Sequence, residues 1–365
     1  MNSTHRVNVV RVKELRTHSN ADSLSLADIG GYQVVVRTEE FDTNKLYAYI
    51  QPDSVVPARE PYKFLWNDRE FTGEVPERYR RITVRRFRKE WSEGLLLPLI
   101  ELLEDANAMY NAKEGDDVAA LLGVTHYEEP DPSYVLGTQG RKLTLWQRIL
   151  KFFGYVPKPF GPKDGPGVYD VESIKNYPRA LAEGEEVIAT EKVHGSNARY
   201  YFDGKQFWVG SHKKWWKDKT NIWWRVAIAN PWIEEFCRAN PKYTLRGEVT
   251  PTQPGYQYGS TPEEQFFAFD VQTPQGDYMD KITLFRELVF VLNGAPVHKT
   301  VPVVYSGPYD AAKLTALAEG KSLAPGAKHI REGIVISSTM ERTVRGLGRA
   351  QLKLKSMKFL EKENA

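Results

Sequence analysis

The first hundred residues contain short runs in which apolar and polar positions alternate, the period of a half-buried β-strand. Glycine, proline or aspartate residues separate the runs, as they do at turns between strands. Several short strands joined by turns predict a small closed β-barrel. The predicted strands occupy residues 7–12, 23–29, 32–36 and 45–50.

The spacing of these strands resembles that of an OB-fold, and residues 18–22 resemble the first loop of tRNA-binding OB modules. Residues 101–123 are typical of a small helical closure that ends at a glycine. We therefore predict an OB-fold-like, nucleic-acid-binding domain over residues 1–125.

Residues 126–165 contain several prolines and are predicted to form a linker. Within them, residues 143–153 place apolar side chains at helical spacing between basic flanks. Two interpretations fit this segment: a helix on a membrane surface, or a helix packed between two domains. We favour the helix packed between domains.

The second half of the chain mixes helical and strand patterns. Asn230 and Pro231 indicate a helix start, with Asn as the N-cap and Pro at the first helical position. A second helix is predicted over residues 310–320, where a glycine ends it. The strands predicted around these helices occupy residues 243–249, 265–271, 333–337 and 350–354.

The composition is that of a globular protein in a reducing compartment. The 365 residues suffice for two domains, each with its own core. A single cysteine, Cys237, excludes an internal disulfide. No apolar run approaches the roughly 20 residues of a membrane span, and the N-terminus lacks the apolar segment of a secretory signal. We expect a cytoplasmic monomer that does not bind membranes.

The basic residues are bunched, although a net charge of +3 is too small to establish a polyanionic partner. Seven of the twelve residues at 78–89 are Lys or Arg. They indicate either a charged edge strand that discourages aggregation, or a strip that contacts phosphates beside stacking aromatic residues. We favour the phosphate strip because its charge is all of one sign. Its candidate contacts are Arg80, Arg81, Arg85, Arg86 and Arg88.

Several strands of the second half carry polar residues that a core strand would not select. Lys192 follows a strand-like run directly before a glycine-containing turn, Glu248 lies in an apolar strand, and Glu332 precedes another. Lys353 and Lys355 share one face of a strand, with leucines on the other. Each residue alone is more readily explained by a surface charge or an ion pair. The ordered set indicates a common site.

In this order the residues resemble the motifs of the covalent nucleotidyltransferases, which include the ATP-dependent polynucleotide ligases and the mRNA capping enzymes. The lysine motif is most similar to that of the RNA ligase 2 family, Glu-Lys-x-His-Gly-x-Asn. Residues 352–359 also resemble the last motif of that family, and the likeness spans residues 166–360. The lysine motif is matched at Glu191, Lys192, His194, Gly195 and Asn197.

The resemblance implies an α+β fold with two parts. The N-terminal part is the OB-fold-like β-barrel, an arrangement similar to one branch of the RNA ligase 2-like enzymes. The C-terminal part, residues 166–365, is a mixed α/β nucleotidyltransferase domain with antiparallel sheets.

The resemblance also implies the roles of the site residues. Lys192 would attack the α-phosphate of ATP and retain AMP as a phosphoramidate, while Lys353 and Lys355 contact that phosphate. Phe269 would stack on adenine, with Glu191 near the base. His194 is included among the catalytic residues, and Gly195 and Asn197 among the nucleotide-binding ones. Glu248 and Glu332 would support ribose and metal binding, with Mg²⁺ or Mn²⁺ as the metal.

The attack requires a neutral amine. With a reference pKa of about 10.4, a lysine side chain at pH 7 is about 4.6 kcal/mol from its neutral form. Neighbouring cations and a metal ion favour the neutral form, and nearby carboxylates oppose it.

The sequence departs from the family after the hairpin that follows the lysine motif. The family has Lys-Arg-x-Gly there, whereas this chain has His212 at the arginine position. Lys213 or Lys214 could replace the arginine, although lysine does not reproduce a bidentate arginine contact. Both lysines belong to a basic and aromatic run that could line a nucleic-acid path.

The sequence therefore predicts an ATP-dependent RNA ligase that joins 3′-hydroxyl and 5′-phosphate ends, at nicks in a duplex, through lysyl-AMP and RNA-adenylate intermediates. One alternative is a DNA ligase or mRNA guanylyltransferase with the same covalent chemistry. His194 argues against it, as does the absence of room for an OB domain after the last motif. The other alternative is a non-catalytic RNA-binding protein on a ligase scaffold.

Overall fold

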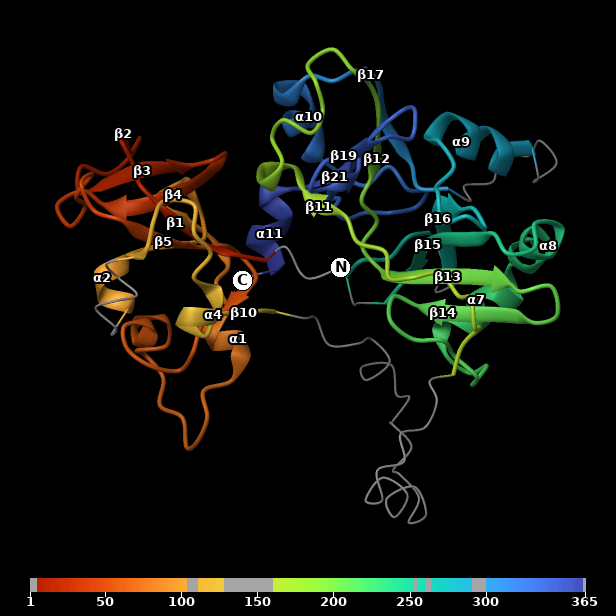
Figure 1. Cartoon of the computed structure of the whole chain (residues 1–365), viewed down its shortest axis with the longest axis horizontal. Coiled ribbons are helices and arrows are strands. Elements are labelled where there is room, and N and C mark those ends of the chain that lie inside the picture. Colours follow the sequence, from red (N-terminus) through yellow and green to blue (C-terminus); the bar gives the residue numbers. More distant parts are fainter. Residues whose placement is uncertain are drawn as a thin grey trace. The chain divides into compact units, whose positions relative to one another are not determined.

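The computed structural model describes residues 5–103, 111–127, 160–252, 255–259, 264–290 and 300–363. The chain divides into two compact units (Figure 1). The first contains Met1–Glu129 together with Met357–Ala365, and the second contains Pro130–Ser356. The C-terminal segment is thus grouped with the N-terminal unit. The domain limits that the sequence suggested, at residues 125 and 166, stay predictions.

The first unit is built mainly from short antiparallel strands. Three of them form the sheet β1-β5-β9, three form β2-β3-β4, and β7 pairs with β8 and β10 with β6. The strands are β1 (Val7–Val10), β2 (Leu15–Thr17), β3 (Leu24–Ile29), β4 (Tyr32–Arg37), β5 (Tyr47–Ile50), β6 (Ser54–Val55), β7 (Val84–Phe87), β8 (Glu90–Glu93), β9 (Leu95–Pro98) and β10 (Thr125–His126).

Short helices close the core of this unit. Leu99 and Leu102 of α2 and Leu122 of α4 are buried against strand residues such as Val7 and Ile50. The C-terminal helix α11 contacts β7. The helices are η1 (Tyr62–Leu65), α1 (Glu77–Arg80), α2 (Leu99–Leu102), α4 (Ala119–Leu122) and α11 (Met357–Glu363).

The second unit contains two larger, mainly antiparallel sheets and the two-stranded sheet β19-β20. The five-stranded sheet has the order β11-β21-β18-β12-β17, and the four-stranded sheet has the order β14-β13-β15-β16. The strands are β11 (Glu172–Ser173), β12 (Glu186–Glu191), β13 (Ser196–Phe202), β14 (Phe207–Ser211), β15 (Thr244–Thr250), β16 (Gln265–Gln272), β17 (Val303–Pro308), β18 (Gly333–Ser338), β19 (Thr343–Val344), β20 (Gly348–Arg349) and β21 (Gln351–Lys355).

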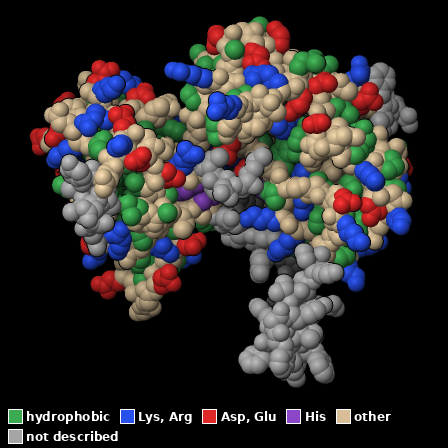
Figure 2. All heavy atoms as spheres, in the orientation of Figure 1, with side chains coloured by type: hydrophobic (Ala, Val, Ile, Leu, Met, Phe, Trp, Pro, Cys, Tyr) green, Lys and Arg blue, Asp and Glu red, His purple; other side chains and the backbone are tan. Residues whose placement is uncertain are grey.

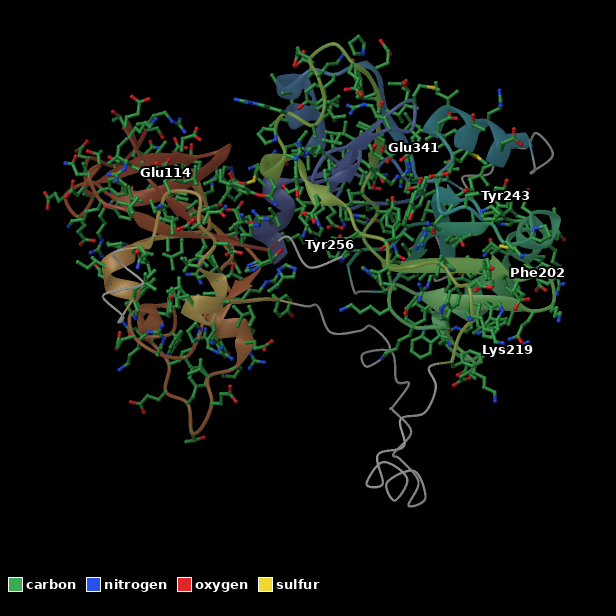
Figure 3. All side chains as sticks on the ribbon, in the orientation of Figure 1. Glu114, Phe202, Lys219, Tyr243, Tyr256 and Glu341 are labelled. Atoms are coloured by element: carbon green, nitrogen blue, oxygen red, sulfur yellow. The ribbon has the colours of Figure 1, made fainter. Side chains whose placement is uncertain are left out.

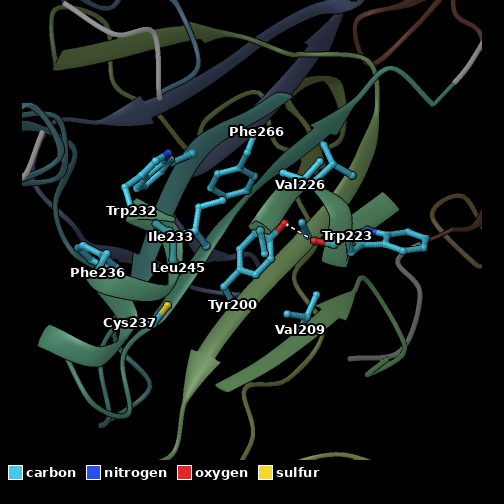
Figure 4. Close-up of a cluster of buried hydrophobic side chains, with 14 of the residues drawn as sticks. Tyr200, Val209, Trp223, Val226, Trp232, Ile233, Phe236, Cys237, Leu245 and Phe266 are labelled. Atoms are coloured by element: carbon cyan, nitrogen blue, oxygen red, sulfur yellow. Dashed lines mark hydrogen bonds between the residues drawn. The ribbon is translucent and has the colours of Figure 1, made fainter. Parts of the chain in front are cut away.

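Helices cover one face of the four-stranded sheet and enclose its core. Ile233 and Phe236 of α8 are buried with Leu245 and Phe266 of the sheet (Figure 4). Tyr200 lies in the same core, and its hydroxyl donates to the carbonyl oxygen of Trp223 at 3.1 Å. The helices of this unit are η2 (Ile174–Asn176), α7 (Ile222–Ala229), α8 (Trp232–Ala239), α9 (Lys281–Phe290) and α10 (Ala311–Ala318).

The helix predicted to start at Asn230 and Pro231 exists, but it begins at Trp232. The prediction of Asn230 as its N-cap was wrong, because the Asn230 side chain donates to the Val226 carbonyl oxygen at 2.9 Å and closes α7 instead. The helix predicted over residues 310–320 is confirmed as α10, and the side chain of Asp310 caps it by accepting from the Lys313 amide.

The arginine-rich segment at residues 78–89 is divided between a short helix and a strand, and its role as a phosphate strip stays a prediction. Its first residues belong to α1, and the strand β7 spans only Val84–Phe87. Arg88 and Lys89 form the turn to β8 with φ of 45° and 81°, as a two-residue hairpin turn requires. The amphipathic segment predicted at residues 143–153 lies outside the described residues.

The described surface carries mixed charge. On the face drawn in Figure 2, Lys and Arg side chains are interspersed with Asp and Glu, in keeping with the small net charge of +3. Within the described ranges, no helix combines the length and apolar character that crossing a membrane requires.

Candidate active site

Lys192 lies where the chain passes from one sheet of the second unit to the other. β12 of the five-stranded sheet ends at Glu191, and β13 of the four-stranded sheet begins at Ser196. The Lys192 amide donates to the Gly333 carbonyl oxygen at 2.9 Å, which fixes this residue beside the start of β18. The lysine therefore extends from a backbone that both sheets hold.

Gly195 allows the crossing to pack tightly. A Cβ atom at this position would lie 2.4 Å from the Val249 carbonyl oxygen and 2.8 Å from Cγ2 of Thr250. Real Cβ atoms do not approach backbone oxygens that closely, so a residue with a side chain would push β13 away from β15. The glycine of the lysine motif thus brings Lys192 toward the strand that carries Glu248.

Glu332 is the centre of the charged site. Its Oε1 lies 2.6 Å from Nζ of Lys192 and 3.8 Å from Nζ of Lys355. Its Oε2 lies 3.3 Å from Nδ1 of His194. Three of the residues predicted from the sequence thus surround the carboxylate of a fourth, Glu332, whose side chain is only 6% exposed.

Burial by itself would raise the pKa of Glu332, yet that pKa lies well below its ordinary value. The Lys192 ammonium overcomes the burial effect, with help from His194 and Lys355. The carboxylate is therefore ionised near neutral pH and can accept hydrogen bonds from both sides.

The strand β21 carries the lysine pair Lys353 and Lys355. Leu352 and Leu354 are buried in the core of the unit, and Lys353 and Lys355 alternate with them on the opposite face. The pKa of Lys353 is lowered by burial, and the positive charges of Lys355 and Lys192 add to the effect. The sequence prediction of a shared lysine face holds in the structure.

Asp170 and Glu172 are carboxylates near this pair that the sequence analysis missed. Both oppose the lowering of the Lys353 pKa. β11 pairs in parallel with β21, with Glu172 opposite Leu352 and Ser173 opposite Lys353. No sequence signal revealed this pairing, because it joins segments about 180 residues apart.

Glu191 is buried and committed to a neighbouring loop. Its Oε1 accepts from the Ser322 hydroxyl at 2.5 Å, and its Oε2 accepts from the Leu323 amide at 2.6 Å. Burial raises its pKa, while these two hydrogen bonds oppose the rise. The carboxylate fixes the loop after α10 beside the lysine motif.

Two tyrosines that the sequence analysis did not identify pack beside His194. The Tyr258 hydroxyl oxygen accepts from the His194 amide at 2.7 Å. The ring of Tyr256, labelled in Figure 3, lies 4.3 Å from the imidazole ring of His194, measured between centroids. Burial raises the pKa of Tyr258, so its hydroxyl stays protonated. These aromatic contacts fix the orientation of the histidine.

A β-bulge in β16 sets the position of Phe269. Arg246 of β15 pairs with Asp270, whereas the next residue, Gly247, pairs with Ala268, so Phe269 has no partner in this ladder. The extra residue in one strand re-aims the side chains that follow. The Phe269 ring packs against Tyr169, with 5.1 Å between centroids and 33° between planes, and it is half-buried.

A buried ionic network lies behind Phe269. Asp270 is fully buried, and its carboxylate lies 2.9 Å from Nζ of Lys281 and 2.8 Å from Nη1 of Arg349. It also accepts from the Tyr169 hydroxyl. Lys281 donates in addition to the Phe269 carbonyl oxygen at 2.8 Å. The network therefore holds both the backbone of Phe269 and the ring that supports it.

Two buried arginines lie near His212, the position where the family has arginine. Arg199 and Arg246 are cross-strand neighbours, and both donate to the Gly167 carbonyl oxygen, at 3.3 and 2.9 Å. Burial lowers the pKa of His212, and both arginines contribute to that lowering. The arginines hold the segment that leads to Tyr169 and Asp170.

Two buried oxygens near Glu248 are placed to contact a polar ligand. Within the parts of the chain that the structure describes, no group of three or more His, Cys, Asp or Glu side chains could hold a metal ion. Asn197 faces Glu248 across β13 and β15. The buried Oδ1 of Asn197 and Oγ1 of Thr250 accept no hydrogen bond there. Unsatisfied buried oxygens next to a carboxylate fit a polar ligand.

The candidate phosphate strip divides into half-buried and exposed arginines. Arg80 donates to the carbonyl oxygens of Val75 and Val56, and Arg81 pairs with Asp53 at 2.6 Å. These two guanidinium groups stabilise the first unit itself. Among the five candidate contacts, the arginines with exposed side chains are Arg85, Arg86 and Arg88. In the second unit, Lys213 and Lys214 are exposed as well.

Comparisons with known proteins agree with this arrangement. Residues 185–355 match the RNA ligase family model, and residues 6–99 match a model of an OB-fold domain. No curated protein matches the chain.

The chain is also similar to solved structures of a Naegleria gruberi RNA ligase. A mutant with ATP and Mn has a TM-score of 0.74 and 20% identity, covering 98% of this chain and 99% of that chain. An apo mutant has a TM-score of 0.76 and 20% sequence identity, and the match covers 100% of each chain. The ligase with PPi has a TM-score of 0.73 and 22% sequence identity, and the match covers 99% of each chain. At this identity the likeness concerns the fold. It confirms the predicted α+β class, and the domain model confirms the OB-fold.

Proposed function

We propose for this RNA ligase with an N-terminal OB-fold domain an ATP-dependent reaction that joins 3′-hydroxyl and 5′-phosphate ends of RNA through lysyl-AMP. The observation that carries the proposal is the convergence of Lys192, Lys355 and His194 on the carboxylate of Glu332. The solved Naegleria gruberi RNA ligase structures with the same fold include complexes with ATP or AMP and Mn.

In the first step the Nζ atom of Lys192 attacks the α-phosphorus. A nitrogen–phosphorus bond forms, the bond to the β-phosphate oxygen breaks, and pyrophosphate leaves. The ammonium must first lose a proton, and the positive charges of Lys353 and Lys355 favour that loss. Glu332 is the nearest acceptor and orients the amine. The proton passes to solvent, and Glu332 holds the neutral amine in position.

Lys353 and Lys355 have a second task. They extend from the same face of β21 as a pair of cations, and such a pair stabilises negative charge that develops on the α-phosphate oxygens. Phe269, backed by Tyr169, offers its free face to the adenine ring. Together these residues place the phosphorus within reach of Lys192.

The metal would be held by phosphate oxygens and the carboxylate of Glu248, with Mg²⁺ or Mn²⁺ as candidates. When bound, such an ion neutralises phosphate charge. Glu332 already contacts two lysines and a histidine. We therefore propose that its main role is to position the lysines and that metal binding is secondary.

Two further steps complete the proposed reaction. AMP passes from Lys192 to the 5′-phosphate of RNA, and the 3′-hydroxyl then displaces AMP to form the phosphodiester. We propose a nick in a duplex as the substrate, with the exposed arginines at Arg85, Arg86 and Arg88 contacting the strand backbone.

The test is covalent labelling with ATP or GTP that carries ³²P at the α-phosphate. The wild type should retain label from ATP, and Lys192→Ala should retain none. Lys313→Ala, an exposed lysine on α10, is the control and should label fully. Label from GTP would instead indicate a guanylyltransferase, and RNA binding without label would indicate a non-catalytic protein.

A pre-adenylated nick separates the steps. Because this substrate bypasses lysyl-AMP, Lys192→Ala should still seal it to some extent. Sealing of a nicked DNA duplex as efficiently as of RNA would favour the DNA ligase alternative.

A further inference from the structure

The second unit contains a pocket that none of the proposed active-site residues lines. It has a volume of about 750 Å³ and lies at the hairpin end of β13 and β14. We call it the aromatic–basic pocket and define it by Trp208, Trp216, Trp224, Lys205, Lys217 and Lys219.

The pocket is remote from the nucleophile. β13 begins at Ser196, beside the lysine motif, and ends at Phe202, next to the hairpin. Seven residues of strand span about 20 Å at about 3.3 Å per residue. A ligand in this pocket therefore does not touch Lys192 directly, and Figure 3 labels Phe202 and Lys219 in this region of the unit.

The aromatic walls of the pocket are held in place by hydrogen bonds and by packing against other rings, such as Phe160 against Trp208 at 5.2 Å between centroids. Trp208 Nε1 donates to Oδ2 of Asp203 at 2.8 Å, and Trp224 Nε1 donates to the Trp216 carbonyl oxygen at 2.8 Å. The Trp216 ring stacks on Trp223, with 5.1 Å between centroids. All three lining indoles are half-buried. Rings fixed in this way lose little entropy when a ligand stacks on them.

The charge of the pocket is positive. Lys205, Lys217 and Lys219 are exposed, and none of the three forms a salt bridge within the described ranges. Nζ of Lys219 lies 4.7 Å from the centre of the Trp224 ring. The one lining carboxylate, Glu234, is neutralised by Arg238 at 2.6 Å. Lys217 and Lys219 are thus available to an anionic ligand, whereas Lys205 lies near the carboxylate of Asp203.

Stacking surfaces next to uncompensated cations are the combination that binds single-stranded nucleic acid. We propose that the aromatic–basic pocket binds a single-stranded segment of the RNA substrate, with a base against an indole ring and phosphates on the lysines. This rests on the proposed function for the identity of the nucleic acid. The site would hold the RNA a few nucleotides from the ends being joined, because the pocket lies about 20 Å along β13 from the lysine motif.

The test measures binding of a fluorescein-labelled 12-nucleotide single-stranded RNA to the full chain over a salt series. Lys217→Ala/Lys219→Ala should lower the slope of log affinity against log salt by about 1.4, because each phosphate contact on a single strand contributes about 0.7. Lys313→Ala/Lys328→Ala removes the same charge from exposed positions outside the pocket and should leave the slope unchanged.

Trp208→Ala should weaken binding of the same RNA about 5- to 150-fold through loss of one base stack. Trp208→Phe keeps an aromatic ring and should recover most of that affinity. All these variants should form covalent AMP as the wild type does, which also shows that they fold.

If the pocket variants had the same RNA affinity and the same salt slope as the control pair Lys313→Ala/Lys328→Ala, the pocket assignment would be wrong. The proposed ligase function would be unaffected. An equal loss of affinity for a twelve-residue polyglutamate peptide would overturn the nucleotide assignment and leave a general anion site. If the wild type forms no covalent AMP but the pocket variants lose RNA affinity as stated, the pocket stands and the proposed function fails.

Discussion

The Nζ atom of Lys192 lies 2.6 Å from Oε1 of Glu332, a carboxylate whose side chain is 6% exposed. The pair has a consequence for stability as well as for catalysis. Because the pKa of Glu332 is held below its ordinary value, the ion pair contributes stability above about pH 4, and the contribution is lost as pH falls.

Lys192→Ala should destabilise the second unit by about 1–3 kcal/mol at pH 7, because Glu332 loses its nearest counter-charge. Lys355, at 3.8 Å from the same oxygen, keeps the loss below that of a fully isolated charge. Lys192→Ala/Glu332→Gln should recover most of the stability while remaining unable to form covalent AMP. Urea unfolding of the wild type, Lys192→Ala and the double variant measures these free energies of unfolding. Stability of Lys192→Ala equal to that of the wild type would contradict the prediction.

Phe269→Ala should impair nucleotide use more than folding. Loss of a base stack of about 1–3 kcal/mol should raise the ATP concentration for half-maximal adenylylation about 5- to 150-fold, with little change in circular dichroism. Phe267, fully buried two residues earlier in β16, provides the contrast: Phe267→Ala should cost about 3–5 kcal/mol of stability. If Phe269→Ala lost folded structure and activity to the same extent, Phe269 would be a structural core residue and not an adenine contact.

Asp270→Asn should destabilise the protein by about 3–5 kcal/mol at pH 7, because the buried Lys281 loses its counter-charge and Arg349 keeps only Glu341. Burial would raise the pKa of Asp270, but Lys281 and Arg349 hold it well below its ordinary value. The wild-type carboxylate therefore contributes stability above about pH 4, and this is lost as pH falls.

The stability difference between wild type and Asp270→Asn should accordingly narrow between pH 5 and pH 3, a window on the order of the unfolded carboxylate pKa. The control is Asp310→Asn, which keeps a good N-cap on α10 and should differ little from wild type at either pH. A gap that stays constant down to pH 3 would rule out the proposed ion-pair origin.

Arg85→Ala/Arg88→Ala should weaken binding of a nicked RNA duplex without reducing adenylylation. On the scale of about 0.9 per phosphate contact, measured for B-form duplexes, the salt slope should fall by about 1.8. The matched control is Arg16→Ala/Arg37→Ala, two exposed arginines in the same unit outside the strip. An equal effect in both pairs would mean that only the overall charge of the unit matters.

The sequence by itself determined the order of the functional residues and most of the elements that carry them. Strand and helix periods are local, so alternation over a few residues was enough to place the strands around Glu248 and Lys353 and the helix α10. The lysine motif could also be recognised from the sequence, because its residues lie within a stretch of seven positions. The helix start predicted at Pro231 was wrong by one residue, since the Asn230 side chain had an alternative partner in the preceding helix.

Tertiary structure alone decided what surrounds those residues. The bulge at Phe269 turns Asp270 away from the core that contains Phe266, Ala268 and Val271, and no local period reveals an unpaired residue in a ladder. Tyr169 reaches the site from a segment 100 residues before Phe269. Arg80 and Arg81 are bonded inside the first unit although the sequence grouped them with exposed arginines. A side chain's partner depends on long-range pairing, and a linear pattern of residue types does not contain that information.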